Sequence, residues 1–129
     1  MYLAALAMVV GGAFVIAVGR RATSGRLPRD GHGGVRTRIT TLSDDTWYPS
    51  QRVAGPWIVA SGSAIAFGGS IIFMARPDDD TGLTIAASAA LIAGVAALVG
   101  ALLASRVAHG VVEAEGGQGR ADRPGKSVN

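Results

Sequence analysis

Three long stretches without a charged residue constrain the fold of this chain more than any other feature. They cover residues 1–19, 53–75 and 81–105. As a helix, each is long enough to cross a hydrocarbon core of about 30 Å, and one charge at its centre would cost about 2.5–3.5 kcal/mol. A soluble domain instead interleaves apolar and charged residues. The sequence therefore predicts an all-α integral membrane protein, with transmembrane helices over 1–19, 55–75 and 83–105.

The charged residues are confined to the segments that connect and follow these spans. Of the 12 basic residues, seven lie in the loop 20–54, one in the turn 76–82 and four in the tail 106–129. Cytoplasmic segments carry the excess of Lys and Arg in membrane proteins. We therefore expect a multi-pass membrane protein with the N-terminus and the acidic turn outside and the loop and tail in the cytoplasm. Heavy use of Ala, Gly, Val and Arg, with Lys126 as the single lysine, suggests a GC-rich bacterial genome and hence a bacterial plasma membrane. The tail is rich in Gly and Arg and has almost no large apolar residues after residue 112, which predicts disorder.

Small residues at four-residue spacing predict how the spans pack. Helices in lipid associate where small side chains let their backbones approach closely. A very short turn joins the second and third spans, so we expect these two to form an antiparallel hairpin. An alanine-rich composition also produces such patterns freely, and a homo-oligomer is a further option. The predicted contact faces are Ala60, Ala64 and Gly68 on the second span, and Ala86, Ala90 and Gly94 on the third.

Several kinds of chemistry are disfavoured by what the sequence lacks. The spans contain no Asp, Glu, Lys, Arg or His, whereas proton relays and ion pathways usually need such groups. Cysteine is absent, and His32 and His109 stand on different segments without the spacing of metal ligands. The three aspartates 78–80 are expected to solvate the outer turn and to favour the positive end of the third span. We predict no enzyme activity, no metal or cofactor, and no direct binding of nucleic acid.

The loop 20–54 contains a segment that looks structured. Ser43 or Asp44 is suited to cap a helix whose first turn is acidic. Pro49 is unfavourable inside such a helix, so the helix would start later, near Thr46, or kink at the proline.

The start of the second span is predicted near Pro56, because a proline in the first turn of a helix loses no hydrogen bond. On physical grounds alone, the segment before it would be a basic helix at the membrane interface. Trp47 and Tyr48 would then rest among the lipid headgroups.

The same loop carries a Gly-aliphatic-Arg-Thr tetrapeptide, then an acidic pair, a Trp, a polar-Arg pair and a Gly. This motif resembles the signature of the SdpI-like family of bacterial membrane proteins, and the spans on either side are similar to that family's terminal module. Arg38 and Ile39 replace a common Pro-Trp, and the Arg at this position resembles actinobacterial members. Gln51 stands where His or Asn is common. The matching residues are Gly34, Val35, Arg36, Thr37, Thr40, Asp44, Asp45, Trp47, Gln51, Arg52 and Gly55.

The resemblance implies immunity to a secreted toxic peptide, or signalling in which the membrane protein sequesters a small cytosolic repressor. Arg36, Arg38 and Arg52 would bind an acidic partner surface or lipid phosphate, with Trp47 as an anchor. The alternative is an accessory subunit that packs on a larger membrane complex through its Ala and Gly faces. The candidate partner- or lipid-binding residues are Gly34, Arg36, Thr37, Arg38, Thr40, Asp44, Trp47, Gln51, Arg52 and Gly55.

Overall fold

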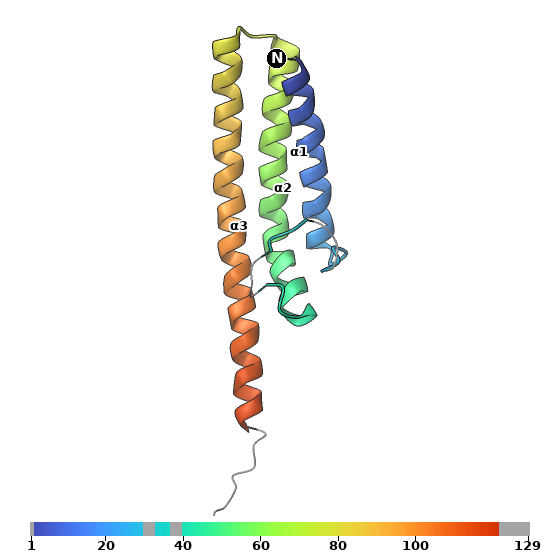
Figure 1. Cartoon of the computed structure of the whole chain (residues 1–129), viewed down its shortest axis with the longest axis vertical. Coiled ribbons are helices and arrows are strands. Elements are labelled where there is room, and N and C mark those ends of the chain that lie inside the picture. The colour runs from blue at the N-terminus through green and yellow to red at the C-terminus, as the bar shows by residue number, and fades with distance from the viewer. Residues whose placement is uncertain (1, 30–32, 37–39, 122–129) are drawn as a thin grey trace, which may run out of the picture.

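The computed structural model of the chain describes residues 2–29, 33–36 and 40–121, with side chains up to residue 118. This part of the chain forms three α-helices: α1 (Tyr2–Thr23), α2 (Asp44–Ala75) and α3 (Asp79–Ala121). Helix α2 lies between α1 and α3, and the start of α1 lies beside the connection from α2 to α3 (Figure 1). All three helices are long and apolar enough to cross a membrane. The predicted all-α fold with three spans is confirmed.

Helices α1 and α2 pack through small residues that repeat every seven positions. Seven residues make about two helical turns, so such residues return to the same face. A Cβ atom on Gly12 would lie 2.6 Å from the carbonyl oxygen of Gly62, and one on Gly55 would lie 2.9 Å from that of Gly19. Because these distances leave no room for a side chain, the two backbones touch directly. The three contact levels are Ala5 with Gly69, Gly12 with Gly62, and Gly19 with Gly55.

Helix α3 packs on a different face of α2, and within the described residues it makes no backbone contact with α1. The hydroxyl of Ser61 donates a hydrogen bond of 3.0 Å to the carbonyl oxygen of Ala93. A Cβ atom on Gly68 would lie 2.7 Å from the Cβ of Ala89. Helix α2 is therefore the central helix, to which the other two attach independently.

The contact face of α3 differs from the predicted one. Ala90 and Gly94 are exposed, and a Cβ atom built on Gly94 would meet nothing within 4 Å. Strict four-residue spacing rotates by about 40° around the helix at each step, so it drifts away from the neighbouring helix. Over the part of α3 that contains the predicted face, the buried positions alternate spacings of four and three: Ala89, Ala93, Ala96 and Gly100. Among the other predicted packing residues, Gly68 is buried, Ala64 and Ala86 are half-buried, and Ala60 is exposed.

Helix α2 begins at Asp44, well before the predicted start of the second span. Ser43 is its N-cap: the Ser43 side chain accepts a hydrogen bond from the N–H of Thr46, and the Thr46 hydroxyl accepts one from the N–H of Ser43. This reciprocal cap initiates the helix ahead of Pro49 and Pro56, which both lie inside it. The later start near Thr46 and the placement of Pro56 in a first turn are therefore wrong.

Helix α3 continues to Ala121, so the prediction of a disordered tail from residue 106 is wrong up to that position. Ala104 and Ala108 are fully buried, so packing supports the helix past the predicted end of the third span. The last turns of α3 extend beyond the other two helices (Figure 1). Residues 122–129 of the predicted tail lie outside the described part of the chain.

Two helix caps close the connection between α2 and α3. Arg76 has a left-handed backbone conformation with φ 48°, and its N–H donates to the carbonyl oxygen of Ile72 at 3.1 Å. At the start of α3, the carboxylate of Asp78 accepts a hydrogen bond of 3.1 Å from the N–H of Thr81. The side-chain and backbone hydrogen bonds of Thr81 lower the pKa of Asp78. The carboxylate of Asp78 thus has a defined structural role as a cap.

Candidate functional site at the basic end of the bundle

Helix α1 ends in a tight turn that directs the chain back across the end of the bundle. The N–H of Arg26 donates to the carbonyl oxygen of Arg21 at 2.9 Å, and the N–H of Gly25 donates to that of Ala22 at 3.3 Å. This pair of bonds, with Gly25 at φ +72°, is a Schellman motif. The turn places the next apolar residue, Leu27, in a buried position.

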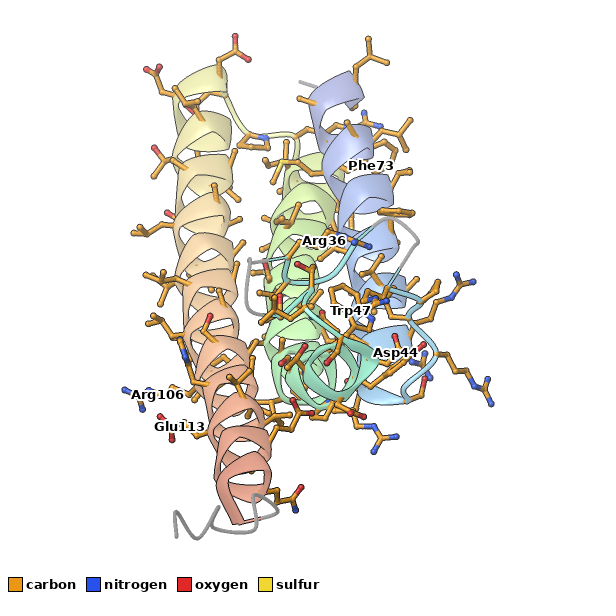
Figure 2. The ribbon with its side chains drawn as sticks, turned by 60° about the horizontal axis from the view of Figure 1, so that its bottom comes forward. Arg36, Asp44, Trp47, Phe73, Arg106 and Glu113 are labelled. Carbon is orange, nitrogen blue, oxygen red and sulfur yellow. The ribbon has the colours of Figure 1, made fainter. Side chains whose placement is uncertain are left out.

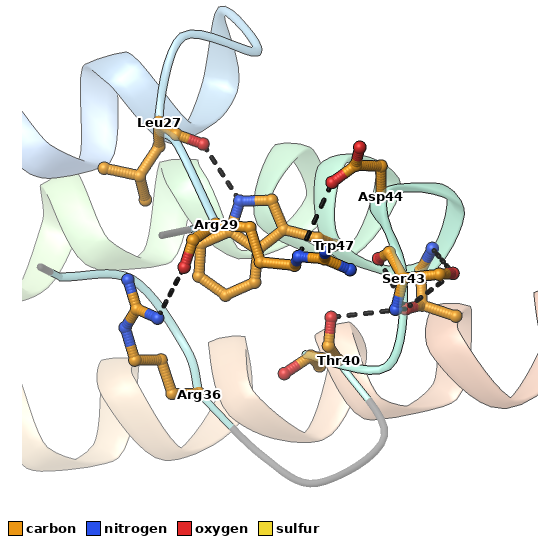
Figure 3. A network of polar contacts seen from close by, with 8 residues as sticks. Leu27, Arg29, Arg36, Thr40, Ser43, Asp44 and Trp47 are labelled. Carbon is orange, nitrogen blue, oxygen red and sulfur yellow. Dashed lines mark hydrogen bonds and ion pairs between the residues drawn. The ribbon is translucent and has the colours of Figure 1, made fainter. Parts of the chain in front are cut away.

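Trp47 joins the end of α1, the loop and the start of α2. Its side chain is fully buried and packs in one cluster with Ala22 and Leu27. The indole Nε1 donates a hydrogen bond of 2.9 Å to the carbonyl oxygen of Leu27 (Figure 3). Because no part of Trp47 reaches the surface, the expectation that it rests among lipid headgroups is wrong. The same burial excludes Trp47 as a direct contact of a partner in this conformation.

Gln51 holds the middle of the loop through both polar atoms of its side chain. It is buried; its Oε1 accepts from the N–H of Val35 at 2.9 Å, and its Nε2 donates to the carbonyl oxygen of Val35 at 2.8 Å. A Cβ atom on the preceding Gly34, whose φ is +80°, would lie 2.5 Å from Oε1 and 2.7 Å from Cδ2 of Leu27. Glycine is therefore required at position 34 for both backbone conformation and space.

The hydroxyls of Thr40 and Thr46 connect the loop to the cap of α2. Thr40 is buried, and its Oγ1 donates to the carbonyl oxygen of Val35 at 3.1 Å. The hydroxyl of Thr46 lies 3.3 Å from the carbonyl oxygen of Thr40 and 2.9 Å from that of Ser43 (Figure 3). The side chain that completes the helix cap therefore also fastens the loop.

Arg36 folds back over the loop that contains it. Its guanidinium lies 4.8 Å from the centre of the Trp47 ring, close enough for a cation–π interaction. Its Nε donates to the carbonyl oxygen of Gly33 at 3.1 Å, and its Nη1 to that of Arg29 at 2.8 Å. Arg29 in turn pairs with Asp44 at 3.5 Å, and the Asp44 side chain is 69% exposed (Figure 3). Arg36 thus has a structural role in closing the loop.

The last two motif residues lie at the junction of α1 and α2. Gly55 packs on Gly19 and Thr23, whose atoms occupy the space that a side chain at position 55 would need. Arg52 is exposed, and its guanidinium lies against Gly25, 3.1 Å from the position of a Cβ there. Arg36 and Trp47 point toward each other near the start of α2, whereas Arg106 and Glu113 on α3 point away from them (Figure 2).

The structure brings most of the predicted motif into one polar network rather than onto an open surface. Thr37 and Arg38 lie outside the described residues. Leu27 and Thr46 were not identified from the sequence as residues of this site. The Ser-x-x-Thr spacing from Ser43 to Thr46 is a signal that could have identified Thr46. Throughout the described residues, every buried polar side-chain atom has a hydrogen-bond partner. We call the folded segment over residues 24–29, 33–36 and 40–52 the basic platform.

These features define a class of protein: a three-span helical membrane protein with a folded, arginine-rich platform at one end of the bundle. The family model described as SdpI/YfhL protein family matches residues 26–112, which cover the basic platform from Arg26 onward, all of α2 and most of α3. The chain belongs to this family, as its motif predicts. Comparisons with curated proteins and with solved structures found no match.

Proposed function

We propose that the chain is an immunity and signalling protein of the bacterial plasma membrane, whose basic platform recruits a cytosolic protein partner. Family membership supports the class of function, because the family is associated with immunity to a secreted toxic peptide. The observation that carries the docking role is the network around Trp47, Gln51 and Thr46, which folds the platform into one fixed shape. A fixed shape lowers the entropic cost of binding a partner.

Charge complementarity supports an acidic surface on that partner. The described residues of the loop 20–54 include six arginines and two aspartates, an excess of four positive charges. Arginine binds carboxylates with a planar fork of donors, and a field of one sign also speeds association. In this proposal Trp47 and Gln51 shape the platform, while exposed arginines contact the partner. Apart from Arg36, which closes the loop, the exposed arginines of the described part of 20–54 are Arg20, Arg21, Arg26 and Arg52.

The proposal is tested by reversing one exposed charge on the platform. Arg26 is exposed, so Arg26→Glu should leave the fold intact while it repels an acidic partner. Cells that lack the gene should become sensitive to their own spent medium, and the unaltered gene should restore survival and partner recruitment. We expect Arg26→Glu to abolish recruitment, whereas the control Arg106→Glu, exposed on α3 and away from the platform, should retain it. Normal recruitment by Arg26→Glu would contradict the docking role.

An accessory subunit of a larger membrane complex is the second candidate function. Ala90 and Gly94 lie exposed on α3, away from the contact with α2, where another helix has access to them. Gly68 no longer supports this function, because Ala89 of the same chain already packs on it. Gly94→Leu should reduce the size of a native complex in mild detergent. Gly11→Leu is the matched control, since position 11 on α1 is equally open.

A further inference from the structure

The first charged residues beyond the apolar spans of α1 and α2 lie at the same depth. The uncharged stretch of α1 ends before Arg20, and that of α2 begins after Arg52. The backbones of Gly19 and Gly55 touch, and each of these arginines is within one helical turn of that contact. Because the two helices pack directly on each other, Arg20 and Arg52 lie close to one another where the uncharged stretches of α1 and α2 end. We call this place the junction of α1 and α2.

Arg52 is placed at this junction by the turn that ends α1. The guanidinium of Arg52 lies against Gly25, the residue between Ser24 and Arg26. A side chain at position 25 would contact this guanidinium. Arg52 is exposed, and within the described residues it forms neither an ion pair nor a side-chain hydrogen bond. The negative end of the α1 dipole favours a cation here, but it is equivalent to only about half a charge. The site keeps an excess of positive charge.

The other described arginines between residues 20 and 52 have different structural roles. Arg36 donates to two loop carbonyls, and Arg29 pairs with Asp44. Two exposed arginines, Arg20 and Arg21, lie in the last turn of α1. Arg26 is exposed on the segment that follows α1. The junction thus combines one positioned guanidinium with three exposed ones at the level where the apolar spans end.

We propose that the junction of α1 and α2 binds the phosphate group of an anionic phospholipid, with Arg52 as its central ligand. The depth of the site is that of lipid headgroups, because both spans become uncharged directly beyond it. A guanidinium donates two parallel hydrogen bonds to phosphate, and basic residues beside a span attract anionic headgroups. The lipid site shares exposed arginines with the proposed partner surface, but a titration with lipid alone contains no protein partner, so the two proposals can fail separately.

The test uses the purified full chain, stripped of lipid in neutral detergent and titrated with phosphatidylglycerol or phosphatidylcholine under native mass spectrometry. We expect phosphatidylglycerol to bind more tightly than phosphatidylcholine. Arg52→Gln should weaken phosphatidylglycerol binding about fivefold, the effect of one basic residue near a lipid surface. Arg106→Gln removes an equal charge at the end of the third uncharged stretch, away from the junction, and should weaken binding less than Arg52→Gln does. Arg52→Lys, which keeps the charge and loses the fork, should fall between.

Two further measurements keep the test decisive. Helix content by circular dichroism reports whether Arg52→Gln folds; if it does not, Arg20→Gln replaces it and should also weaken binding about fivefold. Equal affinity for the two lipids, or equal losses in the junction variant and Arg106→Gln, would overturn the proposal. Displacement of the lipid by soluble glycerol phosphate at similar concentration would assign the site to free phosphate and overturn it as well.

Discussion

The side-chain amide of Gln51 forms two hydrogen bonds with the backbone of Val35, one to its N–H and one to its carbonyl oxygen. A residue in the second turn of a long helix thereby supplies the pairing that a neighbouring strand would supply in a sheet. The bonds hold a loop that has little secondary structure of its own among its described residues. Through them, the shape of the basic platform depends on α2.

Replacing Gln51 should therefore release the loop without unfolding the spans. Gln51→Ala leaves the N–H of Val35 without a partner in a part-buried site, at a cost of about 1–3 kcal/mol. The carbonyl oxygen of Val35 loses one of its two hydrogen bonds and keeps the one from Thr40. We expect faster hydrogen exchange and faster tryptic cleavage over residues 24–36, with unchanged helix content. The control is Gln118→Ala, because Gln118 is exposed near the end of α3. Equal protection of the loop in both variants would contradict the role of Gln51.

Trp47 should contribute to the platform through both its ring and its Nε1 atom. Trp47→Phe retains an aromatic ring and loses the bond to Leu27, with an expected cost of about 1 kcal/mol. Trp47→Ala also leaves a cavity and should cost about 3–5 kcal/mol. Thermal unfolding monitored by proteolysis of the loop measures both effects. Trp57→Phe is the control, since Trp57 is 38% exposed, and its effect should be the smallest of the three.

The seven-residue repeat between α1 and α2 should tolerate no side chain at its centre. A Cβ atom on Gly62 would lie 2.7 Å from the carbonyl oxygen of Gly12, so Gly62→Leu must separate the helices. Spin labels on cysteines introduced at Leu6 and Met74, which line one hollow between these helices, report the separation. The chain has no cysteine of its own to interfere. Gly11→Leu should leave the distance unchanged, and an unchanged distance in Gly62→Leu would refute the direct backbone contact.

Asp78 should stabilise the start of α3 only while it is ionised. Its pKa is lowered in the folded protein by the hydrogen bonds of Thr81, so its contribution is complete above the pKa of the unfolded chain. The contribution is lost as the pH falls below about 4, through the lower pKa of the folded state. Asp78→Ala should unfold at a lower temperature than the unaltered chain at pH 6, and the difference should shrink at pH 3. A difference that persists at pH 3 would contradict the charged cap.

Features that depend on nearby residues could be predicted from the sequence. Hydropathy accumulates along one segment, so the three spans follow from uncharged runs without knowledge of their neighbours. The cap at Ser43 is equally local, because its partner Thr46 is three residues away. The side of the membrane on which each terminus lies stays a prediction, which rests on the distribution of basic residues. The family follows from a motif whose spacing is itself a property of the sequence.

The tertiary structure alone decided which side chains meet. The sequence alone predicted that Trp47 lies at the membrane interface. In the structure, the turn after α1 places the carbonyl oxygen of Leu27 within hydrogen-bond distance of Trp47 Nε1. The contact face of α3 was predicted one step out of register, because a stripe of small residues does not specify the angle at which another helix approaches. The sequence by itself determined what must lie in lipid, since the solvation cost of a charge belongs to each residue separately. Pairing across the bundle depends on chain geometry over many residues, so only the folded structure assigns Arg36, Trp47 and Gln51 to the support of the platform.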